Sequence, residues 1–92
     1  MDIQKEANRH FINNENGGMI GEVIYTATDE GKVTIDHTFV NESRRGENIA
    51  SELVASVVTE MKKQNKKIIP LCPFAKAEFK KKKEYQEIEA SE

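Results

Sequence analysis

Residues 33–54 read VTIDHTFVNESRRGENIASELV, and the spacing of their apolar residues changes halfway along the stretch. Residues 33–40 alternate, which predicts a β-strand with one buried face. The residues expected together on one face are Val33, Ile35, His37 and Phe39. From Ile49 onward apolar residues recur every three or four positions, which predicts an amphipathic helix of about four or five turns. A strand therefore leads into a helix through a loop that contains two arginines and a glycine.

The flanking sequence extends this unit on both sides. Two β-compatible runs, NRHFINN and MIGEVIYTAT, come before it, and the turn signals ENGG and DEGK separate the three strands. After the helix, KIIPLC indicates a short buried strand, and Pro73 is placed to open a second helix over 73–85. A strand, a helix and a strand in this order favour a parallel crossover. We therefore predict a mixed α/β (α+β) fold, an antiparallel β-meander followed by β-α-β-α.

Length and charge limit the possible classes of protein. Ninety-two residues suffice for one domain, 1–92, and 14 basic against 16 acidic side chains give a formal net charge of -2. This near balance argues against a general nucleic-acid binder. The single cysteine cannot form an internal disulfide, which indicates a reducing compartment. We find no apolar run of the roughly 18 residues that span a membrane and no signal peptide, so we expect a cytoplasmic protein, monomeric and without membrane contact.

The loop before the helix has the chemistry of an anion site. A helix N-terminus exposes unpaired N–H groups and carries roughly half a positive charge. Gly46 has no Cβ to block an approaching anion, and Arg44 and Arg45 add positive charge beside it. The alternative is an ordinary strand-to-helix turn with a glycine and two solvated arginines. Local chemistry alone leaves both interpretations open.

A family resemblance favours the first interpretation. RGENIA, residues 45–50, resembles the R/Q-x-x-G-x-G/A motif of the GNAT acetyltransferase superfamily, in which loop amides hold the pyrophosphate of acetyl-CoA. The segments HTFV, IASELVASVV and IPLCPFAKAEF resemble the family's neighbouring strand, helix, and next strand and helix. The combination is similar to very small single-domain GNAT-like proteins over about residues 8–88, the expected ordered core. The resemblance implies a minimal GNAT-like fold with acetyl-CoA as its cofactor.

The resemblance also implies cofactor-binding roles for particular residues. The backbone of Thr38, Phe39 and Val40 would pair with the pantetheine arm as an added strand does. Arg45 occupies the first position of the motif, and Arg44 could add charge near the phosphates. The amides expected to face the pyrophosphate belong to Gly46, Glu47, Asn48, Ile49, Ala50 and Ser51.

Two departures from the family pattern affect these expectations. Asn48 stands where the motif usually has glycine, and asparagine tolerates unusual backbone angles better than most residues. Many GNAT proteins also carry N-x-x-A-x-x-x-Y in the last helix, where the tyrosine protonates the departing thiolate. This chain has Cys72, Ala75 and Phe79 at those spacings, so the usual general acid is missing.

Cys72 and His37 are the candidate catalytic residues. Cys72 precedes a helix, so its thiol could act as an acid toward the leaving thiolate, or as a transient acyl carrier, or simply fill a buried position. His37 could serve as a general base or lie at the edge of the core. Tyr85 could replace the missing acid if the last helix bends back. We expect His10 to be a surface residue, and the sequence supports no metal site.

Three functions remain in order of preference. The first is direct acetyl transfer from acetyl-CoA to an amine, which could be a protein lysine, a protein N-terminus or a small amine. The second is a module or sensor that binds acetyl-CoA without catalysis, which the missing tyrosine favours. The third is a basic interaction module that uses the charge run Lys80–Lys83. That run is equally consistent with a solvated surface.

Overall fold

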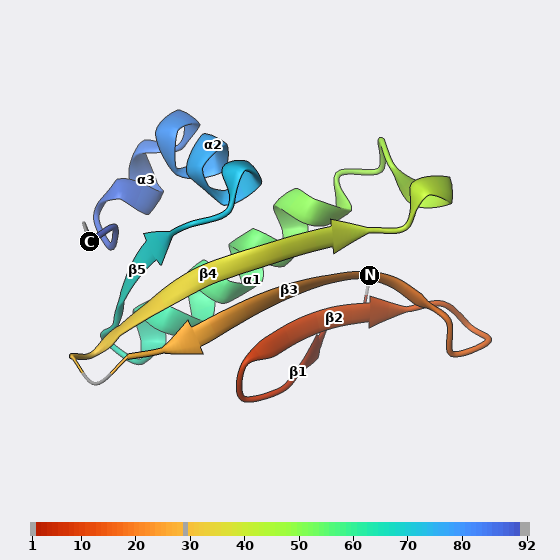
Figure 1. Ribbon diagram of the computed structural model, residues 1–92, viewed down its shortest axis with the longest axis horizontal. Coiled ribbons are helices and arrows are strands. Elements are labelled where there is room, and N and C mark those ends of the chain that lie inside the picture. The colour runs from red at the N-terminus through yellow and green to blue at the C-terminus, as the bar shows by residue number, and fades with distance from the viewer. Residues whose placement is uncertain (1, 29, 91–92) are drawn as a thin grey trace.

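The computed structural model describes residues 2–28 and 30–90, which form a five-stranded sheet with helices packed against it (Figure 1). The strands are β1 (Gln4–Lys5), β2 (Arg9–Asn13), β3 (Met19–Ala27), β4 (Lys32–Val40) and β5 (Lys67–Pro70). The helices are the 3₁₀ turn η1 (Glu42–Arg44), α1 (Ile49–Lys63), α2 (Pro73–Lys81) and α3 (Lys83–Gln86). Strands β1 to β4 are antiparallel neighbours, and β5 pairs with β4 in parallel. The predicted mixed α/β fold is confirmed, with β1 as an unexpected additional edge strand.

Helix α1 covers one face of the sheet, and the core lies between the two. As the periodicity predicts, its inward residues are buried, and they are Ile49, Leu53, Val54, Val57, Val58 and Met61. Gly21 of β3 lets the first turn of this helix come close. A Cβ there would lie 2.9 Å from the carbonyl oxygen of Phe39 and 3.3 Å from a methyl carbon of Leu53. The start of α1 is therefore held against the middle of the sheet.

Strand β4 contains a bulge that the sequence pattern does not reveal. Tyr25 of β3 lies opposite Ile35, but the preceding Ile24 lies opposite His37, which leaves Asp36 as an extra residue. The carboxylate of Asp36 accepts hydrogen bonds from the hydroxyls of Thr26, at 2.5 Å, and Thr34, at 2.6 Å. Extra residues of this kind bend a strand and shift its side chains to the opposite face.

The bulge reverses the expected facing of the second half of β4. Val33 and Ile35 are buried as predicted, whereas His37 and Phe39 are exposed on the other face. The prediction that His37 and Phe39 share the buried face, or that His37 lies at the core edge, is therefore wrong. Their neighbours Thr38 and Val40 turn inward instead, and Val40 packs against the core.

The pairing between β4 and β5 is short. It runs only from Lys32↔Lys67 to Ile35↔Pro70, and it ends with the N–H groups of Leu71 and Cys72 on the Ile35 carbonyl at 3.0 and 3.2 Å. The chain then turns away into α2, as Figure 1 shows. Beyond Ile35 and Pro70 the two strands are therefore no longer paired.

The second helix is interrupted, whereas the sequence predicts a continuous helix over 73–85. Lys82 has extended backbone angles, φ -107° and ψ 104°, which end α2 before α3 begins. This break lets Tyr85 turn back onto Phe79, with ring centroids 5.2 Å apart. The following segment returns to β5, where Ile68 hydrogen-bonds with Ile88 and Ala90 at 2.7 and 2.8 Å. Packing of Tyr85 thus overrides the helical tendency of the lysine run.

His10 is not the surface residue that the sequence predicts. Its side chain is only 1% exposed, with Nδ1 2.8 Å from the Ser56 hydroxyl and Nε2 3.2 Å from the Tyr25 hydroxyl. Burial lowers the pKa of His10, and the nearby charge of Lys5 lowers it further while Glu60 opposes the change. The imidazole links β2, β3 and α1. It could not be recognised from sequence because its partners lie far along the chain.

Candidate functional site

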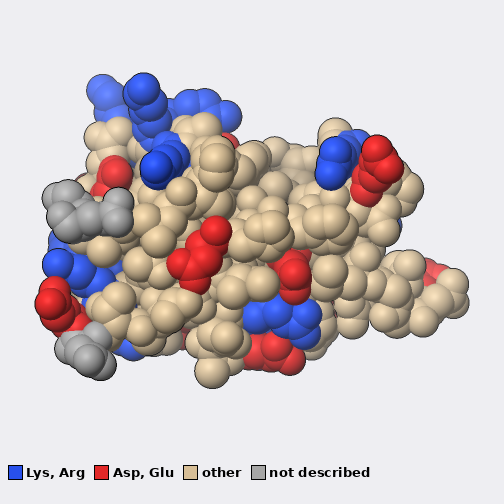
Figure 2. All heavy atoms as spheres, in the orientation of Figure 1, with Lys and Arg blue, Asp and Glu red and all other residues tan. Residues whose placement is uncertain are grey.

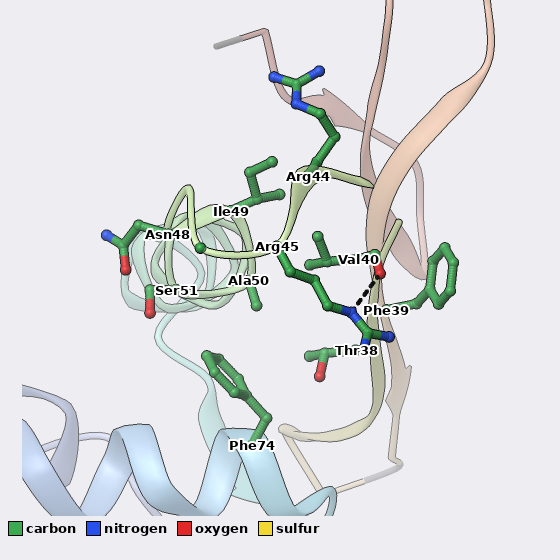
Figure 3. Close-up of a pocket in the computed structure, with 11 residues that line it drawn as sticks. Thr38, Phe39, Val40, Arg44, Arg45, Asn48, Ile49, Ala50, Ser51 and Phe74 are labelled. Carbon is green, nitrogen blue, oxygen red and sulfur yellow. Dashed lines mark hydrogen bonds between the residues drawn. The ribbon is translucent and has the colours of Figure 1, made fainter. Parts of the chain in front are cut away.

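A cavity of about 460 Å³ opens where β4 and β5 separate (Figure 3). Nine of the ten residues predicted to bind the cofactor line it, all except Glu47. Its lining consists of Thr38, Phe39, Val40, Arg44, Arg45, Gly46, Asn48, Ile49, Ala50, Ser51 and Phe74. Sequence reasoning missed Phe74, which lies in the first turn of α2. Its sequence signal is weak: Phe74 directly follows Pro73, shortly after β5 ends at Pro70.

One wall of the cavity is the free edge of β4. Asn41 donates its N–H to Ile20 on the β3 side, whereas the Val40 carbonyl points to the opposite side, where it accepts a hydrogen bond from Arg45. Backbone groups alternate along a strand, so Thr38 also presents its N–H and carbonyl to this edge. Figure 3 shows the side chains of Thr38 and Val40 on the cavity side and the Phe39 ring turned away. This edge can therefore accept an extended polar chain.

The facing wall is the loop before α1 and the helix's first turn. Gly46 has φ +91°, and Asn48 has φ 64° and ψ 21°, so both adopt the left-handed backbone region. The expectation that Asn48 can take the place of the motif's glycine is confirmed in its geometry. The Asn48 side chain does not cap the helix. Within residues 2–28 and 30–90 we find no hydrogen bond that occupies the N–H groups of residues 46–51.

The two arginines of the loop differ in their surroundings. Arg44 is held by Glu47 through two hydrogen bonds of 2.8 Å, and its guanidinium points away from the cavity in Figure 3. Hydrogen bonding to Arg44 lowers the pKa of Glu47, which keeps this pair charged. Arg45 instead lies along the cavity, with its Nε 3.4 Å from the Val40 carbonyl oxygen. The positive charge available to an anion therefore comes mainly from Arg45 and the helix N-terminus.

The structure separates the candidate catalytic residues. Cys72 is 8% exposed and caps α2, because its sulfur accepts the N–H of Ala75 at 3.4 Å. The same sulfur lies 3.9 Å from the Thr38 hydroxyl, although Cys72 is not among the lining residues. His37 is on the opposite face of the sheet. Tyr85 is buried against Phe79, where burial raises its pKa, and it does not line the cavity either.

A buried carboxylate beside the cavity is absent from the sequence-based candidates. Glu78 of α2 is 2% exposed, accepts a hydrogen bond from Lys82 at 2.9 Å and forms an ion pair with Lys81 at 3.3 Å. Burial raises the pKa of Glu78, but its bonds to Lys82, Ser51 and Lys81 outweigh burial and leave the pKa below its ordinary value. Glu78 thus lies where α2 packs against α1, near Ser51. Its spacing from Lys82 is visible in sequence, whereas its burial is not.

Basic side chains gather over α2 and α3, at the upper left of Figure 2. Lys81 and Lys82 form ion pairs with Glu78, so part of this charge is neutralised within the helix. No helix among residues 2–28 and 30–90 is long and apolar enough to cross a membrane. In the same ranges we find no cluster of His, Cys, Asp or Glu that could hold a metal ion.

A family model and the solved structures both relate this chain to acetyltransferases. The family model for GCN5-related N-acetyltransferases matches residues 9–88. A GCN5-like protein from Staphylococcus aureus, solved by NMR, is 30% identical with a TM-score of 0.79, and the match covers 99% of this chain and 89% of that one. No match emerges among proteins with curated functions.

Larger acetyltransferases share the fold. A Brucella melitensis ribosomal-protein-alanine N-acetyltransferase is 21% identical, with a TM-score of 0.63 over 91% of this chain and 63% of that chain. An acetyltransferase from Bacillus cereus is 26% identical, with a TM-score of 0.60 over 65% of this chain and 43% of that chain. The present chain thus matches less than two thirds of the length of these two proteins.

Proposed function

Because the chain belongs to the GCN5-related N-acetyltransferases, we propose that it transfers an acetyl group from acetyl-CoA to an amine. The observation that carries this proposal is that two backbone surfaces without a strand or helix partner face each other across one cavity. One is the free edge of β4 at Thr38 and Val40, and the other is the open N-terminus of α1. Neither surface alone would identify the ligand.

The residues present fit acetyl-CoA on chemical grounds. Amides 46–51 and the helix dipole favour a diphosphate, because they offer hydrogen-bond donors and partial positive charge. The edge of β4 offers both a donor and an acceptor to the two amide groups of a pantetheine arm, as a sheet edge does to an added strand. The cavity volume of about 460 Å³ is in the range of small-molecule sites.

Acetyl-CoA would supply an activated acyl group, and transfer would join the amine nitrogen to the acyl carbon, break the carbon–sulfur bond and leave the proton on the released thiol. The chain's own residues would orient the thioester and exclude part of the solvent. Thr38 faces the cavity, and its hydroxyl is the link to the Cys72 thiol behind it. A contribution of Cys72 to proton movement would therefore pass through Thr38 or an ordered water. His37 faces away and would need a separate route.

The acceptor is proposed to be an exposed amine, such as a lysine or N-terminus on a protein, although a small amine is also compatible. An open, shallow approach to the cavity favours a group that protrudes from its carrier. We propose that the protein acts as a monomer without nucleic acid. We also propose that it is cytoplasmic, because an unpaired cysteine is typical of a reducing compartment.

A binding module or sensor for acetyl-CoA is the second candidate. One observation favours it specifically: Phe79 occupies the position of the family's tyrosine acid and is 1% exposed in the core, with Tyr85 packed behind it. No phenol is therefore available at that point. Such a module would bind acetyl-CoA at the same two backbone surfaces without transferring its acetyl group.

Release of free thiol from acetyl-CoA in the presence of lysine peptides, peptide N-termini and small amines tests transfer. We expect amine-dependent release above the uncatalysed rate, together with acetylated acceptor by mass spectrometry. Binding without such release would favour the module. Cys72→Ser replaces the capping sulfur with a capping oxygen and removes the thiol, whereas Cys72→Ala removes both the thiol and the cap. Activity lost in both variants would indicate a thiol role, and activity lost only in the alanine variant would indicate the cap.

A further inference from the structure

Arg45 stands out among the arginines of this chain. Arg9 pairs with Glu6 and Glu22, and Arg44 pairs with Glu47, so both have carboxylate partners. Within residues 2–28 and 30–90 we find no carboxylate partner for Arg45, whose hydrogen bond goes to the neutral carbonyl of Val40. A guanidinium without an anionic partner beside a cavity is available to a ligand's anion.

The position of Arg45 conflicts with ligand binding at the strand edge. Its Nε bonds the Val40 carbonyl at 3.4 Å, and this carbonyl is one of the groups that the open edge of β4 offers. Figure 3 shows the side chain laid across the cavity beside this strand. A chain that pairs with β4 must first displace Arg45, whose exposed guanidinium then turns to water or to an anion of the ligand.

We infer that Arg45 determines ligand specificity by blocking the β4 edge until a phosphate draws its guanidinium away. A thioester with a diphosphate displaces Arg45 and gives its guanidinium an anionic partner, to which it can donate two parallel hydrogen bonds. A thioester that lacks phosphate also displaces Arg45 but gives its guanidinium no anionic partner. The site therefore selects pantetheine thioesters that carry phosphate and disfavours pantetheine thioesters that lack it. This inference rests on the proposed function and adds a selection against phosphate-free ligands.

Arg44 provides the matched control. It is the adjacent residue with the same charge, but its guanidinium is engaged by Glu47 at 2.8 Å and points away from the cavity. Replacing Arg44 should therefore not uncover the β4 edge. Arg45 is exposed, so its replacement by alanine should leave the folded chain intact, which the melting temperature verifies.

Affinities of acetyl-CoA and of S-acetylpantetheine for the wild type, Arg45→Ala and Arg44→Ala test the inference by calorimetry. For Arg45→Ala we expect opposite changes: acetyl-CoA binding roughly tenfold weaker or more, and S-acetylpantetheine binding roughly two- to tenfold tighter. Arg44→Ala keeps the contact between Arg45 and the Val40 carbonyl, so it should not tighten S-acetylpantetheine binding.

The two ligands distinguish the possible failures. If Arg45→Ala binds S-acetylpantetheine no better than the wild type while acetyl-CoA still binds the wild type, the blocking role is wrong and the proposed function stands. A charge-only role for Arg45 gives this result, because it weakens acetyl-CoA alone. If acetyl-CoA binds neither protein, both the proposed function and the inference are overturned.

Discussion

The two halves of β4 differ in what lies on their outer side, a strand in one case and a cavity in the other. The first half, Lys32–Ile35, has a strand on each side, β3 and β5, and its apolar residues are fully buried. The second half, Thr38–Val40, has β3 on one side and a cavity on the other. The bulge at Asp36 separates them. The first half is buried in the core, whereas the second half has no strand partner for the backbone groups on its cavity side.

This difference shows how a small chain can hold both a core and a cavity on a single sheet. A continuous β4–β5 ladder would satisfy the backbone groups of Thr38 and Val40 and leave no edge for a ligand. The bulge and the early turn into α2 break the ladder near the same point. The core and the cavity therefore share one strand, and substitutions in its two halves should separate stability from binding.

The largest effect should come from the closed half. Ile35→Ala removes a side chain that is 0% exposed, so the unfolding free energy should fall by about 2 to 5 kcal/mol. Val40→Ala, in the open half, should cost less because Val40 is only partly buried. Urea denaturation of both variants measures the difference. Equal losses would show that the two halves are packed alike.

Gly21→Ala should damage both halves at once. The added Cβ would meet the Phe39 carbonyl oxygen at 2.9 Å and side chains of Ile49 and Leu53 at 3.2 and 3.3 Å. We expect the free energy of unfolding to fall by about 1 to 3 kcal/mol, because β4 and the start of α1 must both move away from the new Cβ on β3. Acetyl-CoA should bind more weakly, because both cavity walls shift. Gly18→Ala, whose Cβ would lie nearest to the Asn14 side chain and away from the cavity, is the control. Unchanged binding in Gly21→Ala would mean that the cavity tolerates this shift.

The closed half should also depend on pH through His10, since Tyr25 lies opposite Ile35 and contacts the buried imidazole. The pKa of His10 is lowered by burial, so below about pH 6.5 the unfolded chain binds a proton that the folded chain resists. Stability should therefore fall as the pH decreases from 6.5.

His10→Phe removes this titration, and both hydroxyls keep backbone acceptors, Tyr25 at Glu6 and Ser56 at Leu53. Its unfolding free energy, measured by denaturation between pH 7 and pH 5, should decline less than that of the wild type. Parallel pH profiles for the two proteins would contradict the assigned pKa direction.

The smallest effect should appear in the loop facing the open half. Glu47→Gln releases Arg44 from its pair, so acetyl-CoA should bind roughly two- to fivefold tighter at low salt and lose this gain at high salt. Glu42→Gln makes the same charge change in the neighbouring turn without releasing Arg44. Equal gains in both variants would indicate a general charge effect.

Much of this fold follows from sequence because its signals are local. The alternation in β3 and β4, the four-residue spacing in α1, and Pro73 at the start of α2 each depend on neighbouring residues. The loop residues of the cavity were also predictable, because a motif keeps them contiguous.

The features that sequence reasoning missed depend on distant contacts. The bulge at Asp36 is recognisable only from the register with β3, and it moves His37 to the other face. The burial of His10 depends on Ser56 and Tyr25, and that of Glu78 on the packing of α2 against α1. No spacing within a single element reports such contacts.

The most direct test of the central claim is an amide-resolved NMR titration with acetyl-CoA. The account predicts that the amide signals of Thr38, Val40 and residues 46–51 shift together and saturate, while those of Lys32–Ile35 change little. A titration that leaves 46–51 unaffected, or that moves only the lysines of α2 and α3, would contradict the binding site described above.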